Sequence, residues 1–236
     1  MRQMGTVAEN IEAIRARIRA AAERSGRDPR SVRLVAVSKH QPLEVIREAM
    51  GAGQMVFGEN YLQEAETKVA ALGQGLVWHC IGHLQSNKAR IAAEIFDCIE
   101  TLDRLKLAKG LESRLAELGK TMPVLMQVNV GGEGQKAGVS PEKAEQLCRE
   151  LQQFPHLRLQ GFMTMPPFVE NPEESRGYFR QLRLLGEELA VQGFLGQHGP
   201  MELSMGMSGD FEVAIEEGAT LVRVGTALFG ERDQAV

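Results

Sequence analysis

The 236-residue sequence has few cysteines, few aromatic residues and no long apolar run. Its three cysteines, Cys80, Cys98 and Cys148, are widely spaced among apolar residues, so we expect buried thiols in a reducing compartment and no disulfide or zinc framework. No apolar segment reaches the roughly 20 residues that a membrane helix requires, and the N-terminus lacks a signal-peptide core. We therefore expect a cytoplasmic protein that does not enter the membrane.

The sequence also lacks an excess of basic residues. It has 27 Lys and Arg against 31 Asp and Glu, and its net charge of -4 offers no electrostatic footprint for nucleic acid or an anionic membrane. No Pro/Ser-rich linker, charge block or low-complexity run divides the chain. A single domain is therefore expected over residues 1–236.

Regular alternation of strand and helix patterns runs along the chain. Thr6 and Glu9 form a capping-box pattern, and Ile11, Ile14 and Ile18 then follow one helical stripe, so residues 1–30 contain an opening helix. The strand candidates are Arg33–Ser38, Gln54–Phe57, Leu76–Ile81, Phe96–Glu100, Val124–Val128, Arg158–Phe162, Glu202–Met205 and Leu221–Val224. The helix candidates between them are Leu43–Met50, Leu62–Leu72, Lys88–Glu94, Asp103–Leu118, Glu142–Gln153, Glu173–Gln192 and Phe211–Glu217.

About eight β-then-α units in this length favour a closed (β/α)₈ barrel over residues 31–232. The alternative, an open doubly wound sheet, normally has a Gly-rich first turn, whereas the first strand here is followed by Ser38-Lys39-His40-Gln41-Pro42. Alternate residues of a strand share a face, so Val35, Val37 and Lys39 point the same way. If that face is the barrel interior, Lys39 lies inside the upper mouth.

Polar residues collect at the expected C-terminal ends of the strands, where barrels of this kind carry their chemistry. They are Lys39, Asn60, His83, Asn129, Thr164, Ser204–Ser208 and Arg223–Thr226. His79 shares a face with His83, but the sequence supplies no third ligand, so we predict no metal site. The glycine-rich residues 131–138 match neither GxxxxGK[ST] nor GxGxxG and are interpreted as a flexible loop.

Two amide-rich turns follow the seventh and eighth strands. Leu203–Asp210 leaves a strand through small residues and enters a helix, with Ser208 as a candidate N-cap, and Arg223–Thr226 forms the second turn. Barrels commonly hold a phosphate after these strands, and barrel closure brings Lys39 next to them. A lysine beside a phosphate-binding turn suggests pyridoxal phosphate (PLP). The alternative is another phosphorylated metabolite, with which Lys39 makes only an electrostatic contact.

The chemistry of PLP places further demands on this mouth. A lysine that attacks an aldehyde must be neutral, so its pKa must fall from about 10.4 through desolvation and nearby positive charge. Val35, Val37 and Arg223 are suitable neighbours of Lys39. An arginine at the ring nitrogen leaves the ring neutral and a poor electron sink, which suits a racemase or a cofactor holder better than a transaminase.

Six motifs in order, "LVAVSKHQP", "FGENYLQEA", "WHCIGHLQSNK", "VNVGGEGQKAGV", "GFMTMPP" and "LSMGMSGDFEVAIEEGATLVRVGTALFG", resemble the pyridoxal phosphate homeostasis protein family. The family's fold is similar to the N-terminal barrel of alanine racemase, a barrel of fold-type III among PLP proteins, and the resemblance runs from Val32 to Arg232. It implies PLP held as a Schiff base on Lys39, with Arg223 facing the pyridine nitrogen. It also implies phosphate contacts from Ser204, Met207, Ser208, Gly225 and Thr226, with Asn60 and His83 flanking the ring.

The pattern departs from alanine racemase, which adds a C-terminal domain and a catalytic tyrosine. Here the sequence ends at Val236, and neither of its tyrosines, Tyr61 and Tyr178, falls in a corresponding segment. The resemblance therefore implies a monomer that buffers PLP and supplies apo-enzymes, without robust catalysis. A weak amino-acid racemase or lyase, with His83 or a water as the second base, is the alternative.

Overall fold

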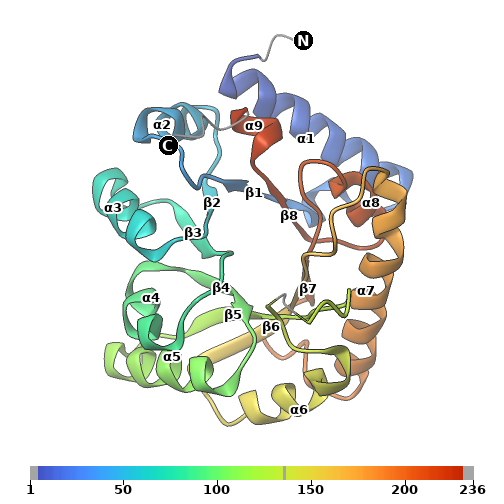
Figure 1. The fold of residues 1–236 in the computed structure, drawn as a ribbon. Coiled ribbons are helices and arrows are strands. Elements are labelled where there is room, and N and C mark those ends of the chain that lie inside the picture. The colour runs from blue at the N-terminus through green and yellow to red at the C-terminus, as the bar shows by residue number, and fades with distance from the viewer. Residues whose placement is uncertain (1–4, 135–136, 231–236) are drawn as a thin grey trace.

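A computed structural model describes residues 5–134 and 137–230 of the chain. Eight parallel strands close into a barrel, in which each strand pairs with the next and β8 pairs with β1 (Figure 1). The strands are β1 Arg33–Val37, β2 Val56–Glu59, β3 Val77–Cys80, β4 Cys98–Leu102, β5 Met122–Gln127, β6 Leu157–Met163, β7 Glu202–Ser204 and β8 Leu221–Val224. The predicted (β/α)₈ barrel is confirmed.

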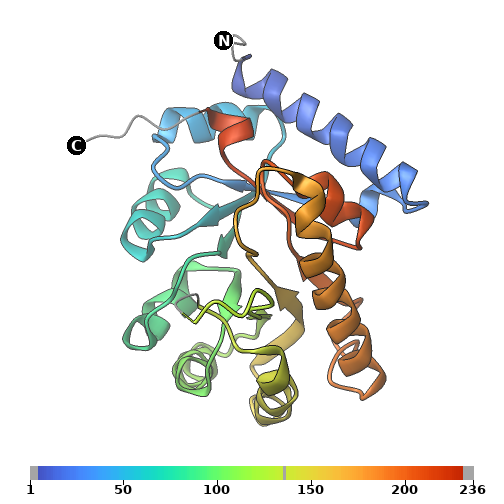
Figure 2. The same cartoon turned by 45° about the vertical axis from the view of Figure 1, so that its right-hand side comes forward.

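Helices form a ring outside the strands, and α1 lies across the outside of that ring beside α8 and α9 (Figures 1 and 2). The α-helices are α1 Val7–Arg24, α2 Leu43–Gly51, α3 Leu62–Leu72, α4 Ala89–Ile95, α5 Leu105–Leu118, α6 Pro141–Leu151, α7 Arg176–Val191, α8 Phe211–Glu216 and α9 Thr226–Phe229. Short 3₁₀ turns are η1 Pro29–Ser31, η2 Ser86–Lys88 and η3 Pro172–Ser175. The predicted capping box of α1 is present, with reciprocal hydrogen bonds between Thr6 and Glu9.

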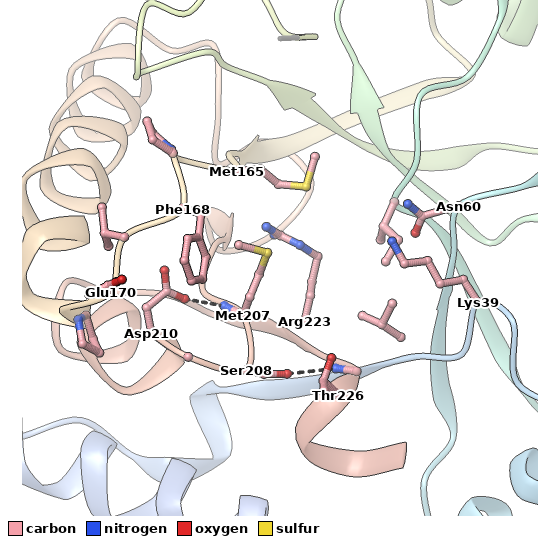
Figure 3. Close-up of a pocket in the computed structure, with 17 residues that line it drawn as sticks. Lys39, Asn60, Met165, Phe168, Glu170, Met207, Ser208, Asp210, Arg223 and Thr226 are labelled. Atoms are coloured by element: carbon pink, nitrogen blue, oxygen red, sulfur yellow. Dashed lines mark hydrogen bonds between the residues drawn. The ribbon is translucent and has the colours of Figure 1, made fainter. Parts of the chain in front are cut away.

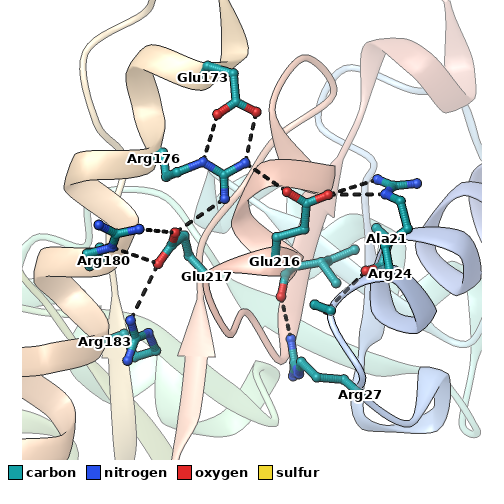
Figure 4. A network of polar contacts seen from close by, with 11 residues as sticks. Ala21, Arg24, Arg27, Glu173, Arg176, Arg180, Arg183, Glu216 and Glu217 are labelled. Carbon is teal, nitrogen blue, oxygen red and sulfur yellow. Dashed lines mark hydrogen bonds and ion pairs between the residues drawn. The ribbon is translucent and has the colours of Figure 1, made fainter.

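A network of arginines and glutamates ties α1, α7 and α8 together on the outside of the barrel (Figure 4). Glu216 receives hydrogen bonds from Arg24 on α1 and Arg176 on α7. Glu217, which directly follows α8, is the hub for three arginines of α7: Arg176, Arg180 and Arg183. The network fixes the position of α8, which follows the turn after β7.

Two strand predictions were displaced toward the N-terminus by two residues. The second strand was expected at Gln54–Phe57 but covers Val56–Glu59, because Gln54 is a buried side chain that donates to Leu34 O at 2.8 Å and to Val56 O at 2.7 Å. Gly58 pairs with Val37 and His79 in this strand, and a Cβ there would lie only 2.9 Å from Val35 Cγ1 in the barrel interior. The fourth strand likewise covers Cys98–Leu102, not the predicted Phe96–Glu100.

The apolar core has two layers, which follow the alternation of each strand. A large cluster between sheet and helices includes Leu34 and Ala36 of β1. A small cluster of Val35, Leu125, Met163 and Leu221 fills the barrel interior. The predicted parity of β1 is therefore confirmed, and Val37 and Lys39 stand above this interior layer.

The predicted buried thiols are confirmed: all three cysteines are buried and free of disulfides. Burial raises the pKa of Cys80 and of Cys148 to about 12. Within residues 5–134 and 137–230, no helix is long and apolar enough to cross a membrane. Gln135 and Lys136 of the predicted glycine-rich loop, and the end of the predicted barrel beyond residue 230, lie outside the described part of the chain.

Candidate functional site

A cavity of about 430 Å³ opens at the C-terminal ends of the strands (Figure 3). Its volume falls within the range typical of small-molecule sites. Seven of the predicted site residues line it together: Lys39, Asn60, Met207, Ser208, Arg223, Gly225 and Thr226. The cavity has Lys39 and Asn60 on one side, Arg223 and Met207 in the middle, and Phe168, Glu170 and Asp210 on the far side.

Lys39 is half-buried and emerges from a constrained turn directly after β1. The next residue, His40, has a φ of 61°, in the left-handed region that side chains other than glycine rarely adopt. Its backbone N–H donates to Glu64 Oε1 at 2.5 Å, which holds the turn against α3. A residue in such a conformation persists only where surrounding contacts determine it.

A buried ammonium group supplies those contacts from the helix side of the barrel wall. Lys68 of α3, only 4% exposed, donates to Ser38 O at 2.6 Å, to Glu59 Oε1 at 2.7 Å and to Glu64 Oε1 at 2.6 Å. Ser38 Oγ also donates to Glu59 Oε1, at 2.6 Å. We call these four residues, Ser38, Glu59, Glu64 and Lys68, the Lys68 clamp. Their contacts hold the backbone on both sides of Lys39.

A second buried polar chain crosses the barrel beneath the opposite part of the cavity. Arg223 of β8, 3% exposed, donates from Nη1 to Ser204 Oγ at 2.6 Å and from Nη2 to Thr164 O at 2.7 Å. Ser204 Oγ donates in turn to Glu100 Oε2 at 2.5 Å. The other oxygen of Glu100 lies 2.6 Å from His79 Nδ1. Thus β3, β4, β7 and β8 each contribute one member of this chain.

Burial and neighbouring charges oppose each other at both ionisable ends of this polar chain, Glu100 and Arg223. Desolvation acts to raise the pKa of Glu100, but hydrogen bonds from His79 and Ser204 and the charges of His79 and Arg223 outweigh it and the pKa is lowered. Desolvation lowers the pKa of Arg223, opposed by the charges of Glu100 and Asp210. Glu100 is therefore a buried carboxylate that balances a buried guanidinium.

The turns after β7 and β8 are joined by one hydroxyl. Ser208 Oγ accepts hydrogen bonds from the backbone N–H groups of Gly225 and Ala227, both at 3.3 Å. The prediction that Ser208 caps the following helix was wrong. Asp210 occupies the N-cap position of α8, and its Oδ1 accepts from Met207 N at 2.7 Å, which leaves the Ser208 hydroxyl to the other turn.

Two predicted site residues do not line the cavity. Ser204 is fully buried beneath it and contacts Arg223. His83 is exposed and faces a neighbouring hollow of about 210 Å³ with Gln85 and Lys88. Their roles toward a cofactor stay predictions.

The sequence analysis missed the far wall of the cavity and both buried charge clusters. Met165, Phe168 and Glu170 belong to the connection between β6 and η3, which reads as an ordinary proline-containing loop. Glu100 carried a usable signal, because it ends the predicted apolar strand Phe96–Glu100 at a position where a buried side chain is expected, whereas Glu59 lay outside the predicted second strand. A buried carboxylate requires a partner, so the position of Glu100 points to a cluster around it.

Comparison with known proteins identifies the family. Residues 10–233 match the family model of the alanine racemase N-terminal domain. A curated pyridoxal phosphate homeostasis protein of Pseudomonas aeruginosa is 49% identical over 232 residues, covering 98% of this chain and 97% of the relative. The protein of the same name from Aquifex aeolicus is 45% identical over 225 residues, covering 95% and 97%.

The chain belongs to the pyridoxal phosphate homeostasis protein family. Among solved structures of similar chains is PipY of Synechococcus elongatus with PLP bound, at 40% identity and a TM-score of 0.83, covering 95% of this chain and 100% of that one. An alanine racemase of Clostridium difficile has a TM-score of 0.73 at 15% identity, and the match covers 98% of this chain and 58% of the racemase. That second likeness concerns the fold alone. The resemblance drawn from the six sequence motifs is confirmed.

Proposed function

We propose that this protein binds PLP in the cavity between Lys39 and Arg223 and serves PLP homeostasis by buffering the cofactor and supplying it to other proteins. The observation that carries the proposal is the set of hydrogen-bond donors that line one cavity. They are the amine of Lys39, the guanidinium of Arg223, and the turns that contain Ser208, Gly225 and Thr226. The family supports it, because its curated members bear the name of this function and PipY was solved with PLP.

Each group of PLP finds a chemically suitable residue in this donor set. Lys39 Nζ supplies the amine for a Schiff base, and the turns of Ser208, Gly225 and Thr226 supply hydroxyl and amide donors for the phosphate. Arg223 supplies a guanidinium for the pyridine nitrogen. PLP, when bound, contributes a reactive aldehyde and an electron-accepting ring.

The cavity favours holding the cofactor over efficient racemisation. A racemase needs a base on each face of the substrate α-carbon, and neither Tyr61 nor Tyr178 lines the described cavity. His83, the other candidate base, does not line it either and borders a neighbouring hollow. An arginine opposite the ring nitrogen also leaves the ring a poor stabiliser of carbanions. We expect no α-hydrogen exchange from a panel of amino acids beyond that caused by free PLP.

The same proposal places the protein in the cytoplasm as a monomer that exchanges PLP with apo-enzymes. Its three free, buried thiols fit a reducing compartment. Size-exclusion chromatography with light scattering checks the monomer, and PLP transfer to an apo-enzyme across a dialysis membrane separates release into solution from transfer by contact.

The deciding experiment is a visible absorption spectrum of the purified protein with PLP, before and after borohydride reduction. We expect a band that reduction removes, a PLP-sized adduct on the Lys39 peptide, and neither feature in Lys39→Ala. Lys109→Ala, which changes an exposed lysine of α5, is the matched control and should behave as wild type. An adduct on another lysine refutes the Lys39 assignment, and no binding at all refutes the proposed function.

A further inference from the structure

The hydrogen bonds that link Arg223, Ser204, Glu100 and His79 have a fixed donor-to-acceptor direction. A serine hydroxyl has one proton, and the Ser204 proton points to Glu100 Oε2 at 2.5 Å. Ser204 Oγ therefore presents only lone pairs to Arg223 Nη1, which donates to it at 2.6 Å. The direction holds as long as Glu100 is an acceptor, which agrees with its lowered pKa.

Glu100 is itself fixed in place. It is fully buried, and its two oxygens are held at 2.6 Å by His79 Nδ1 and at 2.5 Å by Ser204 Oγ. Rotation of the carboxylate would break both hydrogen bonds. Arg223 is anchored on its second arm by Thr164 O at 2.7 Å, so the guanidinium is held at two points.

We propose that Glu100, held by His79, is a positioning residue for PLP binding: acting through Ser204, it fixes the Arg223 guanidinium at the floor of the cavity. The inference rests on the proposed function, because it assigns the part of the site that meets the pyridine ring. Arg223 touches the cofactor, whereas Glu100 and His79 lie behind it and set how firmly and in which orientation the guanidinium is presented.

A structural role alone does not account for this arrangement. A buried charge pair placed only for stability is commonly matched or exceeded by apolar residues of similar volume. Here the chain ends on a side chain that lines the cavity, and three other strands contribute to holding that single group. A hydrogen-bond donor that is already fixed in place loses little side-chain conformational entropy when a ligand binds, so binding is more favourable.

The test compares Glu100→Gln, Ser204→Ala and the double variant by fluorescence titration with PLP and by the absorption maximum of the bound cofactor. Each single change should weaken PLP binding about tenfold, which corresponds to about 1.4 kcal/mol. Each should also shift the absorption maximum, since the group at the ring nitrogen has moved. Because both residues act through one chain, the double variant should bind PLP no more than about twofold more weakly than either single variant.

The matched control is Glu112→Gln, the same change in a second histidine–glutamate pair. Glu112 Oε1 lies 2.7 Å from His156 Nδ1, outside the cavity. This variant should keep wild-type affinity and spectrum. If Glu100→Gln does not fold, Ser204→Ala, which removes only a hydroxyl, carries the test by itself.

Three results distinguish failure of the positioning role from failure of the proposed function. Wild-type PLP affinity and an unchanged spectrum in both Glu100→Gln and Ser204→Ala, with a shifted spectrum in Arg223→Gln, overturn the positioning role and leave the proposed function standing. Additive losses in the double variant overturn it as well. Failure of the wild-type protein to bind PLP overturns the proposed function itself.

Discussion

Removal of the Lys68 ammonium should strongly destabilise the fold, because three acceptors depend on it. In Lys68→Met, Ser38 O, Glu59 and Glu64 each lose a donor at 2.6 to 2.7 Å. Glu59 is fully buried, and its second oxygen already has no hydrogen-bond partner within the described residues. Burial already raises the pKa of Glu59, so the variant leaves a buried carboxylate that has only the Ser38 hydroxyl as a donor and must take up a proton or stay without a counter-charge.

Breaking a buried ion pair by removing one partner typically costs about 3–5 kcal/mol, and protonation of Glu59 places this case at the lower end. We expect a loss of about 3 kcal/mol, which for a chain of this size lowers the melting temperature by roughly 6–12 °C. The measurement is thermal unfolding at neutral pH, followed by circular dichroism. Lys109→Met, at an exposed site on α5, is the control and should melt with the wild type.

A second substitution separates the effect of Lys68→Met on stability from its effect on the position of Lys39. Adding Glu59→Gln to Lys68→Met removes the carboxylate that has lost its counter-charge, so part of the lost stability should return. The anchors on Ser38 O and Glu64 stay absent, so attachment of PLP to Lys39 should remain slower than in the wild type. A melting temperature of Lys68→Met within about 2 °C of wild type, or a double variant no more stable than the single one, would refute the reasoning.

Three further predictions concern other parts of the molecule. Burial raises the pKa of Cys148 to about 12, against about 8.5 in the unfolded chain. The folded state therefore binds the thiol proton more tightly than the unfolded state does. The resulting stabilisation is complete below about pH 8.5 and is lost as the pH rises toward 12. Denaturant titrations should accordingly show that Cys148→Ala weakens the alkaline loss of stability. Gly58→Ala places a Cβ 2.9 Å from Val35 Cγ1 and should cost about 1–3 kcal/mol in urea unfolding, without a change of m-value. Ser208→Ala removes the acceptor for Gly225 N and should weaken binding of PLP severalfold but not that of pyridoxal, which lacks the phosphate; equal losses for both would contradict a phosphate role.

The fold could be predicted because its signals are local. Helices such as Leu62–Leu72 and strands such as Leu221–Val224 were placed at their observed bounds, since propensity, caps and turn residues agree there. The predicted second strand ended too early because glycine and glutamate, here Gly58 and Glu59, are both depleted in strands. Only the barrel interior, which has no room for a side chain at Gly58, and Lys68, which pairs with Glu59, make them strand residues.

In the candidate site, too, some positions could be predicted from local sequence patterns, whereas others depend on tertiary contacts. Residues at strand ends, such as Lys39, Asn60 and Arg223, could be found because the barrel brings all these ends to one mouth. His83 follows a strand too, yet it is exposed and borders a neighbouring hollow, since the direction of a side chain beyond a strand end depends on the loop. Ser204 is buried against Arg223 and does not line the cavity, because strand parity alone does not distinguish a cavity wall from the layer beneath it; its predicted phosphate contact stays a prediction.

The two buried clusters hold two groups that line the cavity, the turn of Lys39 and the Arg223 guanidinium. The Lys68 clamp lies between the barrel wall and α3 and holds the turn that carries Lys39. The chain from His79 to Arg223 crosses the barrel interior and holds the guanidinium. The clusters share no residue, so the amine and the guanidinium are fixed independently from opposite sides of the wall. Changes in one cluster should therefore leave the other in place, and the losses of PLP affinity caused by Lys68→Met and Glu100→Gln should add within about 0.5 kcal/mol.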